Sequence, residues 1–438
     1  MKTLRLLSAL ALLSVGRPAL AEPLTGFGVQ NLVSSSPSDA GWVDPTLRDA
    51  WGIAIRPTEK GVGGHFWISS AGNGTSNQYL GDVAGSPLVQ DALVNMDVPP
   101  WPAGYSPPSP SGPESFVPDG VGVSRPTGQT WQQTPGFVVT LPHLRQNVTN
   151  PAKFLFATED GMISAWTDNK EPDGTPNWVG YSVPVINRAQ EGSRFYGITV
   201  SNESGYLYVA DLGVSPGIRV FNPDFSERGD FGGALNPFAG DDGVQPGEFT
   251  PFNVQTLHGN GSGNLFVTYV EATADPANVF ATGASLGRLA EYTPAGELVS
   301  TWDDHGLLNA PYGLALAPAD FGLASDLLLV GNAGDGTIVA FDPTTRAAVD
   351  YLRAADGSPV TIDGLKGLTF GNGISLGDAH ALYFTGGPSG GQEGVFGKVI
   401  AVPEPSAQAL AALAATFVGV VLFKRRSGSG SSTARGRH

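Results

Sequence analysis

Asp49, Asn309 and Asp363 carry oxygen atoms from which a metal site could be built. Carboxylate and amide oxygens are the ligands that Ca²⁺ takes in proteins. The competing interpretation is that these side chains cap the ends of strands and bond to loop amides, as most buried polar groups do. A Ca²⁺ site therefore stays a hypothesis that depends on whether the fold brings the three residues together.

Arg125 and Arg194 favour a different ligand. A guanidinium group pairs with two oxygens of a carboxylate or a phosphate. With Asp49 and Thr250 beside them, the two arginines predict a site for an anion.

These candidates occupy equivalent positions in a repeated pattern. The repeat contains the pairs Trp51-Gly52, Tyr196-Gly197, Tyr312-Gly313 and Lys366-Gly367, with weaker copies at Gly128 and Asn253. Asp49, Arg125, Arg194 and Thr250 stand three positions before the Gly or its counterpart, whereas Asn309 and Asp363 stand four positions before it. The residues should therefore gather at one mouth of whatever structure the repeat builds.

The repeat predicts β-strands. Each unit consists of four apolar runs of four to eight residues, separated by Gly, Asp, Asn and Pro, which is the length of strands and too short for helices. Six units recur at a spacing of roughly 60 residues, and strand quartets at such a period indicate a propeller or a solenoid. Inserted segments interrupt the pattern at residues 99–119 and 273–285. The first is expected to be either a lid over the ring or an excursion from it.

The two ends of the pattern favour a closed ring. The sixth unit has three strands and stops at Val402, while residues 27–33 form an isolated strand pattern before the first unit. That early strand can complete the last unit and so remove exposed sheet edges. We therefore predict an all-β fold, a six-bladed β-propeller closed by its N-terminal strand, over residues 22–401. The innermost strand of each blade is expected to line an axial channel.

Composition excludes several classes of function. The chain of 438 residues has no Cys, which rules out a disulfide framework, a thiolate zinc site and a cysteine nucleophile. Its formal net charge of −16 argues against nucleic-acid binding, which normally shows a basic stripe.

The termini predict export. Residues 1–21 combine Lys2 and Arg5, an apolar middle and a small-residue cleavage site, as in a secretory signal read by the Sec machinery. At the other end, an apolar stretch at 407–423 is followed by three basic residues, which predicts a transmembrane helix. The tail at 427–438 has a disordered composition.

The C-terminal pattern at 402–426 resembles the PEP-CTERM sorting tag of bacterial surface proteins, because Pro403, Glu404 and Pro405 precede the apolar stretch. The resemblance implies processing by an exosortase-type enzyme and a location in the cell envelope, on the cell surface or outside the cell. The alternative is a plain single-pass anchor.

The repeat region resembles an uncharacterised family of bacterial secreted proteins. The matching segments are FATEDG at 156–161, GNAGDG at 331–336 and DGLKGLTFGNG at 363–373. The resemblance implies an NHL-like or gluconolactonase-like six-bladed propeller and implies no activity. In gluconolactonase-like propellers a divalent metal lies on the axis, although their acidic ligand motif is not recognisable in this chain.

Two functions follow from these patterns. The favoured one is a ligand- or partner-binding module at the cell surface. The alternative is a Ca²⁺-dependent, lactonase-like hydrolase that acts in the axial channel through Asp49, Asn309 and Asp363.

Overall fold

The computed structural model describes residues 23–402, except for positions 38–39, 58–59, 92, 104, 106–122, 143–146, 171–175, 178–179, 231–235, 241, 258–262 and 275–279. The predicted signal peptide, the sorting segment from Pro403 onward with Glu404 and Pro405, the tail, and most of the 99–119 insertion lie outside the described residues. Within the described part, no helix is both long and apolar enough to cross a membrane.

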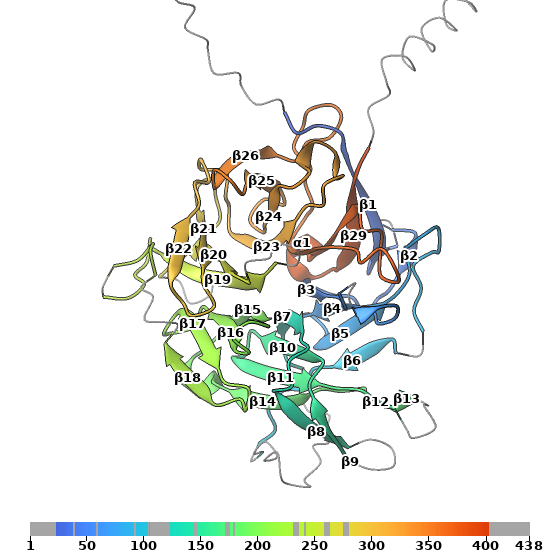
Figure 1. Cartoon of the computed structure of the whole chain (residues 1–438), viewed down its shortest axis with the longest axis vertical. Coiled ribbons are helices and arrows are strands. Elements are labelled where there is room, and N and C mark those ends of the chain that lie inside the picture. Colours follow the sequence, from blue (N-terminus) through green and yellow to red (C-terminus); the bar gives the residue numbers. More distant parts are fainter. Residues whose placement is uncertain are drawn as a thin grey trace, which may run out of the picture.

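Six antiparallel sheets surround a common axis, which confirms the predicted six-bladed propeller (Figure 1). The strands of each blade are named from the axis outward. Blade 1 is β3 (Ala50–Ala54), β4 (Phe66–Ser70), β5 (Thr75–Tyr79) and β6 (Asn95–Asp97). Blade 2 is β7 (Pro126–Trp131), β10 (Phe154–Thr158), β11 (Met162–Trp166) and β14 (Val183–Asn187). Blade 3 is β15 (Phe195–Val200), β16 (Leu207–Asp211), β17 (Gly217–Phe221) and β18 (Glu227–Asp230).

The remaining blades have the same order of strands. Blade 4 is β19 (Phe249–Thr256), β20 (Leu265–Glu271), β21 (Gly287–Tyr292) and β22 (Leu298–Thr301). Blade 5 is β23 (Pro311–Leu316), β24 (Leu328–Asn332), β25 (Ile338–Asp342) and β26 (Ala347–Tyr351). Blade 6 is β27 (Leu365–Phe370), β28 (Ala381–Gly386), β29 (Val395–Ala401), β1 (Phe27–Ser34) and β2 (Trp42–Val43).

Short elements decorate this frame. A hairpin of β8 (Val138–Pro142) and β9 (Asn147–Pro151) is inserted in the sequence between the first two strands of blade 2. A second pair is formed by β12 (Asn169–Lys170) and β13 (Pro176–Asn177). Single turns occur at Ala189–Glu191, Gly322–Ala324 and α1 (Pro388–Gly391).

The chain closes the ring with its own first strand. β1 pairs antiparallel with β29, with Phe27 opposite Ala401 and Val29 opposite Val399. Beyond the ladder, the Val402 amide donates to the Gly26 carbonyl at 2.7 Å. Figure 1 shows the two strands, blue and red, side by side although they lie at opposite ends of the sequence.

One predicted strand is wrong. The apolar run at residues 87–94 predicts the fourth strand of blade 1, but the ladder forms at Asn95–Asp97, where Asn95 lies opposite Asn77. Val89 instead folds back to bridge Leu80. The apolar run 87–94 therefore belongs to an excursion that precedes the strand.

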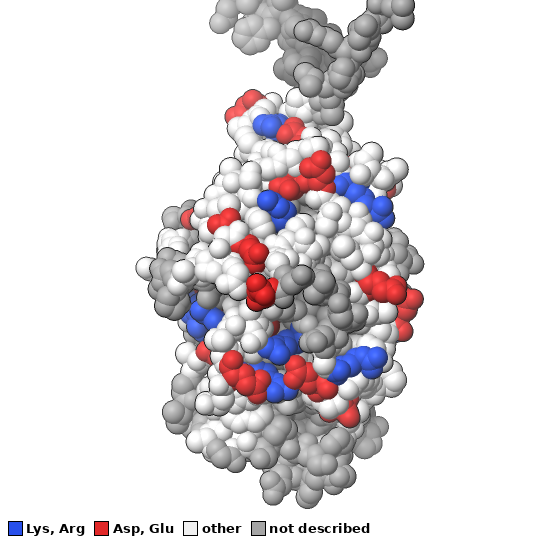
Figure 2. All heavy atoms as spheres, turned by 90° about the vertical axis from the view of Figure 1, so that its left-hand side faces the viewer, with Lys and Arg blue, Asp and Glu red and all other residues white. Residues whose placement is uncertain are grey.

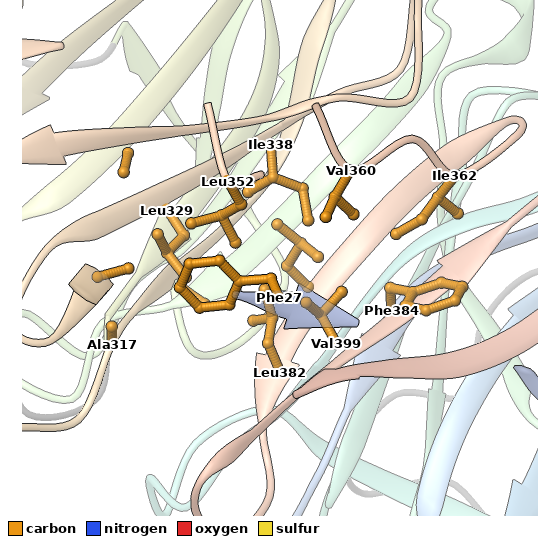
Figure 3. Packing of buried hydrophobic residues seen from close by; sticks show 14 of the residues in the cluster. Phe27, Ala317, Leu329, Ile338, Leu352, Val360, Ile362, Leu382, Phe384 and Val399 are labelled. Atoms are coloured by element: carbon orange, nitrogen blue, oxygen red, sulfur yellow. The ribbon is translucent and has the colours of Figure 1, made fainter. Parts of the chain in front are cut away.

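Buried apolar side chains fill the space between neighbouring blades. In the cluster between blades 5 and 6, Phe27 of β1 packs among Leu329, Leu352, Leu382 and Val399 (Figure 3). Five further clusters lie between the other pairs of blades. Each blade thus buries both faces of its sheet, as a single four-stranded sheet alone could not.

The repeated glycines allow the inner strands to approach one another at the axis. A Cβ atom on Gly128 would lie 2.2 Å from the Tyr196 carbonyl oxygen, and one on Gly367 would lie 2.7 Å from the Trp51 oxygen. The counterpart in blade 4, Asn253, donates its side-chain amide to the Tyr312 carbonyl at 2.8 Å. The sequence repeat thus marks the positions where neighbouring backbones meet.

Candidate functional site at the two ends of the axis

Three of the predicted ligand-binding residues come together at the end of the axis where the inner strands begin. The Arg125 guanidinium lies 3.0 Å from the Asp49 carboxylate and 2.7 Å from Glu159, which also pairs with Arg194. Thr250, the fourth predicted residue, is only 2% exposed.

This network links three blades. Asp49 precedes β3, Arg125 precedes β7, Glu159 follows β10 and Arg194 precedes β15. The Tyr196 hydroxyl also donates to Glu159 at 3.1 Å. Both arginines are therefore engaged by carboxylates of the chain itself, and an anionic ligand would have to displace them.

Burial and charge act on these groups in opposite directions. Burial alone would raise the pKa of Glu159, but its bonds to Arg125 and Arg194 outweigh burial and hold the pKa below its usual value. Burial dominates at Asp49 and raises its pKa, although Lys366 and Arg125 partly offset the effect. Burial likewise lowers the pKa of Lys366 against the attraction of Asp49 and Asp363.

The predicted metal ligands are not arranged as one shell. The Asn309 side-chain oxygen accepts from the Gly283 amide at 2.7 Å, and its nitrogen donates to Asp335 at 2.9 Å. Asp363 is exposed and accepts from the Ser389 amide at 3.3 Å. Among the described residues, no three His, Cys, Asp or Glu side chains are grouped so that they could hold a metal ion.

Large side chains fill the axis directly below the charged network. Trp51, Tyr196, Phe252 and Tyr312, each from the inner strand of a different blade, pack with ring centroids 5.1 to 6.1 Å apart. Phe280, from the insertion in blade 4, adds a ring 4.7 Å from Phe252. The expected axial channel is therefore plugged at this end.

The axis opens at the opposite end, where the inner strands finish. A hollow of about 100 Å³ is bounded by all six inner strands. Of the six residues that stand two positions after the repeated Gly or after Asn253, all but Ala315 line this hollow: Ala54, Thr130, Thr199, Gln255 and Thr369. We call this hollow the funnel.

A second hollow of about 160 Å³ adjoins the funnel beside blade 5. Ile55, Gln255 and Thr369 line both hollows, so the two share a wall. The second hollow, which we call the side chamber, is lined in addition by apolar side chains that include Leu257, Leu316 and Phe370.

No charged residue is among the described residues that line either hollow. On the face drawn in Figure 2, charged side chains of both signs are scattered over a mostly uncharged surface. The two ends of the axis thus differ: one is charged and plugged, and the other is uncharged and open.

The polar residues three and four positions before the repeated Gly predicted the charged end of the axis, whereas the funnel was missed. The same alignment of the repeats, followed two positions beyond the Gly, gives Ala54, Thr130, Thr199, Gln255, Ala315 and Thr369, a set with no charge. That pattern was available as a signal, because in a strand residues two apart point to the same face.

Comparisons with known proteins give relatives without an assigned activity. No family model matches the chain. It is 26% identical over 378 residues to the uncharacterized protein R648 of Acanthamoeba polyphaga mimivirus, covering 86% of this chain and 80% of that protein. It is 25% identical over 378 residues to the uncharacterized protein L690 of the same virus, covering 85% of each.

Solved structures with a similar arrangement are distant. A glucose dehydrogenase is 12% identical, with a TM-score of 0.43 over 85% of this chain and 98% of its own. A gluconolactonase from Xanthomonas campestris is 13% identical, with a TM-score of 0.33 over 68% of this chain and 98% of its own.

Proposed function

We propose that this propeller is a binding module, without catalytic activity, that takes a small uncharged ligand into the funnel. The observation that carries the proposal is the uncharged lining of the open end of the axis. All six inner strands contribute to this wall, and none of the described residues in it is charged. A charged ligand would lose its hydration there and find no partner of opposite sign.

The charged end supports binding of an anion less well. Arg125 and Arg194 are already paired with Asp49 and Glu159. A guanidinium group removed from its carboxylate leaves that carboxylate partly buried and unpaired, which is costly. We therefore assign these four residues to the stability of the ring.

The polar groups of the funnel suit hydroxylated ligands. The Thr130 and Thr369 hydroxyls each donate to the next carbonyl at 3.3 Å, so their oxygens retain lone pairs that can accept. The Gln255 amide donates to the Leu314 carbonyl at 2.8 Å. A ligand hydroxyl both donates and accepts, and so matches such a wall.

Isothermal titration calorimetry with matched sugars tests this function. Glucose is the uncharged probe, and gluconate and glucose 6-phosphate are its anionic counterparts. We expect binding of glucose and at least tenfold weaker binding of both anions. Tighter binding of either anion would contradict the proposal, as would the absence of any binding.

Variants locate the binding. Thr369→Arg introduces a cation into the wall that both hollows share, and we expect it to abolish glucose binding. Thr361→Arg, at an exposed position of the same polypeptide segment, is the matched control. Thr369→Val, which removes only the hydroxyl, should weaken binding and keep the melting temperature of the wild type.

We also propose that the binding module acts outside the cytoplasm. The support is the sequence pattern at residues 1–21 and 402–426. Fractionation of cells that produce the full chain tests this, and retention of an uncleaved protein in the cytosol would contradict it.

A further inference from the structure

The funnel and the side chamber form one site with two kinds of wall. The two hollows share a wall that is formed by Ile55, Gln255 and Thr369. A ligand that enters one hollow therefore lies next to the other, and the chemistry of both walls bears on what the ligand is.

The funnel wall is mainly polar where the inner strands end. Thr199 and Thr256 are joined there by a hydrogen bond of 3.0 Å between their hydroxyls. Thr130, Gln133 and Asn202 line the same hollow. This is a surface for a compact head group that carries hydroxyls.

Apolar side chains form part of the side-chamber wall, alongside polar groups. The half-buried side chains of Leu257, Leu316 and Phe370 line it. Phe370 is fixed in place by an edge contact with Phe321, with ring centroids 5.0 Å apart. Binding of a ligand becomes more favourable when such side chains remove its methylene groups from water.

We infer that the ligand is an uncharged amphiphile, with a hydroxylated head in the funnel and a short alkyl tail in the side chamber. The inference rests on the proposed function of the funnel. It adds the prediction that affinity depends on a tail, which a site for free sugars or polyols would not require. The small volume of the side chamber limits the part of the tail that gains affinity.

A series of alkyl glucosides measures the contribution of the tail. Calorimetric titration with methyl, butyl, hexyl and octyl β-D-glucoside, each below its micellar concentration, gives the dissociation constants. We expect affinity to rise by about fourfold for each buried methylene group, which corresponds to ~0.8 kcal/mol. The rise should stop once the side chamber is filled, and the heat capacity change of binding should become more negative along the series.

A pair of leucine variants assigns the tail to its chamber. Leu316→Asn makes the wall of the side chamber polar, and we expect the dissociation constants for methyl and octyl glucoside to become equal. Leu323→Asn, at a position 53% exposed in the same blade, is the control and should keep the full difference. Thermal unfolding of both variants verifies that they fold.

The outcomes separate the two proposals. If methyl glucoside binds and longer tails add no affinity, the amphiphile is wrong while the funnel stands. If no member of the series binds, both are wrong. If octyl sulfate binds as tightly as octyl glucoside, the requirement for an uncharged head is wrong.

Discussion

Gly128 occupies a position where a methyl group has no room. Its Cβ would lie 2.2 Å from the Tyr196 carbonyl oxygen and 3.1 Å from the Ile198 amide nitrogen. Both atoms belong to the backbone of the next blade, so the clash cannot be relieved by a rotamer change. We expect Gly128→Ala to lower the free energy of unfolding by about 3 kcal/mol, the upper end for overpacking.

The control for this substitution is Gly217→Ala. Gly217 lies in β17, and a Cβ there meets nothing within 4 Å. Urea unfolding of this variant should differ from the wild type by only a few tenths of a kcal/mol. Equal effects of the two substitutions would contradict the close approach of the inner strands.

Glu159 should stabilise the ring at neutral pH. Glu159→Gln leaves Arg125 and Arg194 with weaker partners, and we expect a loss of about 1–2 kcal/mol at pH 7, since both arginines are partly exposed. The folded-state pKa of Glu159 is lowered. Its contribution is therefore full above the unfolded-state pKa and is lost as the pH falls through the folded-state pKa.

Unfolding of wild type and Glu159→Gln between pH 7 and pH 3 measures this linkage. The difference between the two proteins should shrink below the unfolded-state pKa of Glu, about 4.3. The exposed residue Glu297, changed to Gln, serves as the control and should show little difference at any pH. A gap that widens in acid would show that Glu159 is not held by its cations.

Calcium should not stabilise the protein. Asp49 pairs with Arg125, and the Asn309 oxygen already accepts from Gly283. A bound ion at excess over its dissociation constant would raise the melting temperature. We expect the same melting temperature and no opening of lactones with Ca²⁺ or with a chelator. A shift that disappears in Asp49→Asn would restore the hydrolase as the better hypothesis.

The closing strand makes a matched comparison at the scale of an element. Val33 of β1 is fully buried against Leu47 and Phe396, whereas Val29 of the same strand is 44% exposed. We expect Val33→Asp to cost more than about 3 kcal/mol, because it buries an unpaired charge, while Val29→Asp stays near wild-type stability. Thermal unfolding distinguishes them, and tolerance of Val33→Asp would mean that β1 does not seal blade 6.

How far the sequence predicted these elements depends on how the pattern is built. Strands that run apolar between Gly and Asp turns, such as β24 and β25, follow the predicted pattern of short apolar runs. The pairing of β1 with β29 followed from the sixth unit, which has only three strands of its own. The fourth strand of blade 1 was misplaced because the paired segment Asn95–Asp97 is only three residues long and has a polar residue at each end, so no apolar run marks it.

The site was harder to predict because its character depends on pairs of residues far apart in sequence. Arg125 looks like a free anion binder until Glu159 and Asp49 are seen beside it. The plug of Trp51, Tyr196, Phe252 and Tyr312 requires four blades at once. The uncharged residues two positions after the repeated Gly are the one part of the site that the sequence repeat indicates directly.

At the scale of the whole molecule, closure of the ring means that the chain could begin and end at other turns of the propeller. The Val402 amide bonds to the Gly26 carbonyl, so the ends of the propeller touch within blade 6. A short Gly-Ser linker can join them at a small entropic cost. New ends can then be placed between Asp356 and Gly357, an exposed turn between β26 and β27. We expect this permutant to fold with an unfolding free energy within about 2 kcal/mol of a linear chain that ends at Val402.

A second permutant is the control for the first. Ends placed between Tyr383 and Phe384 interrupt β28, where both side chains are fully buried. We expect that protein not to fold, as judged by circular dichroism and analytical ultracentrifugation. If both permutants fold equally well, the blades are not the cooperative units of the ring. If neither folds, the propeller requires β1 at the N-terminus of the chain. The role of β1 would then go beyond pairing with β29.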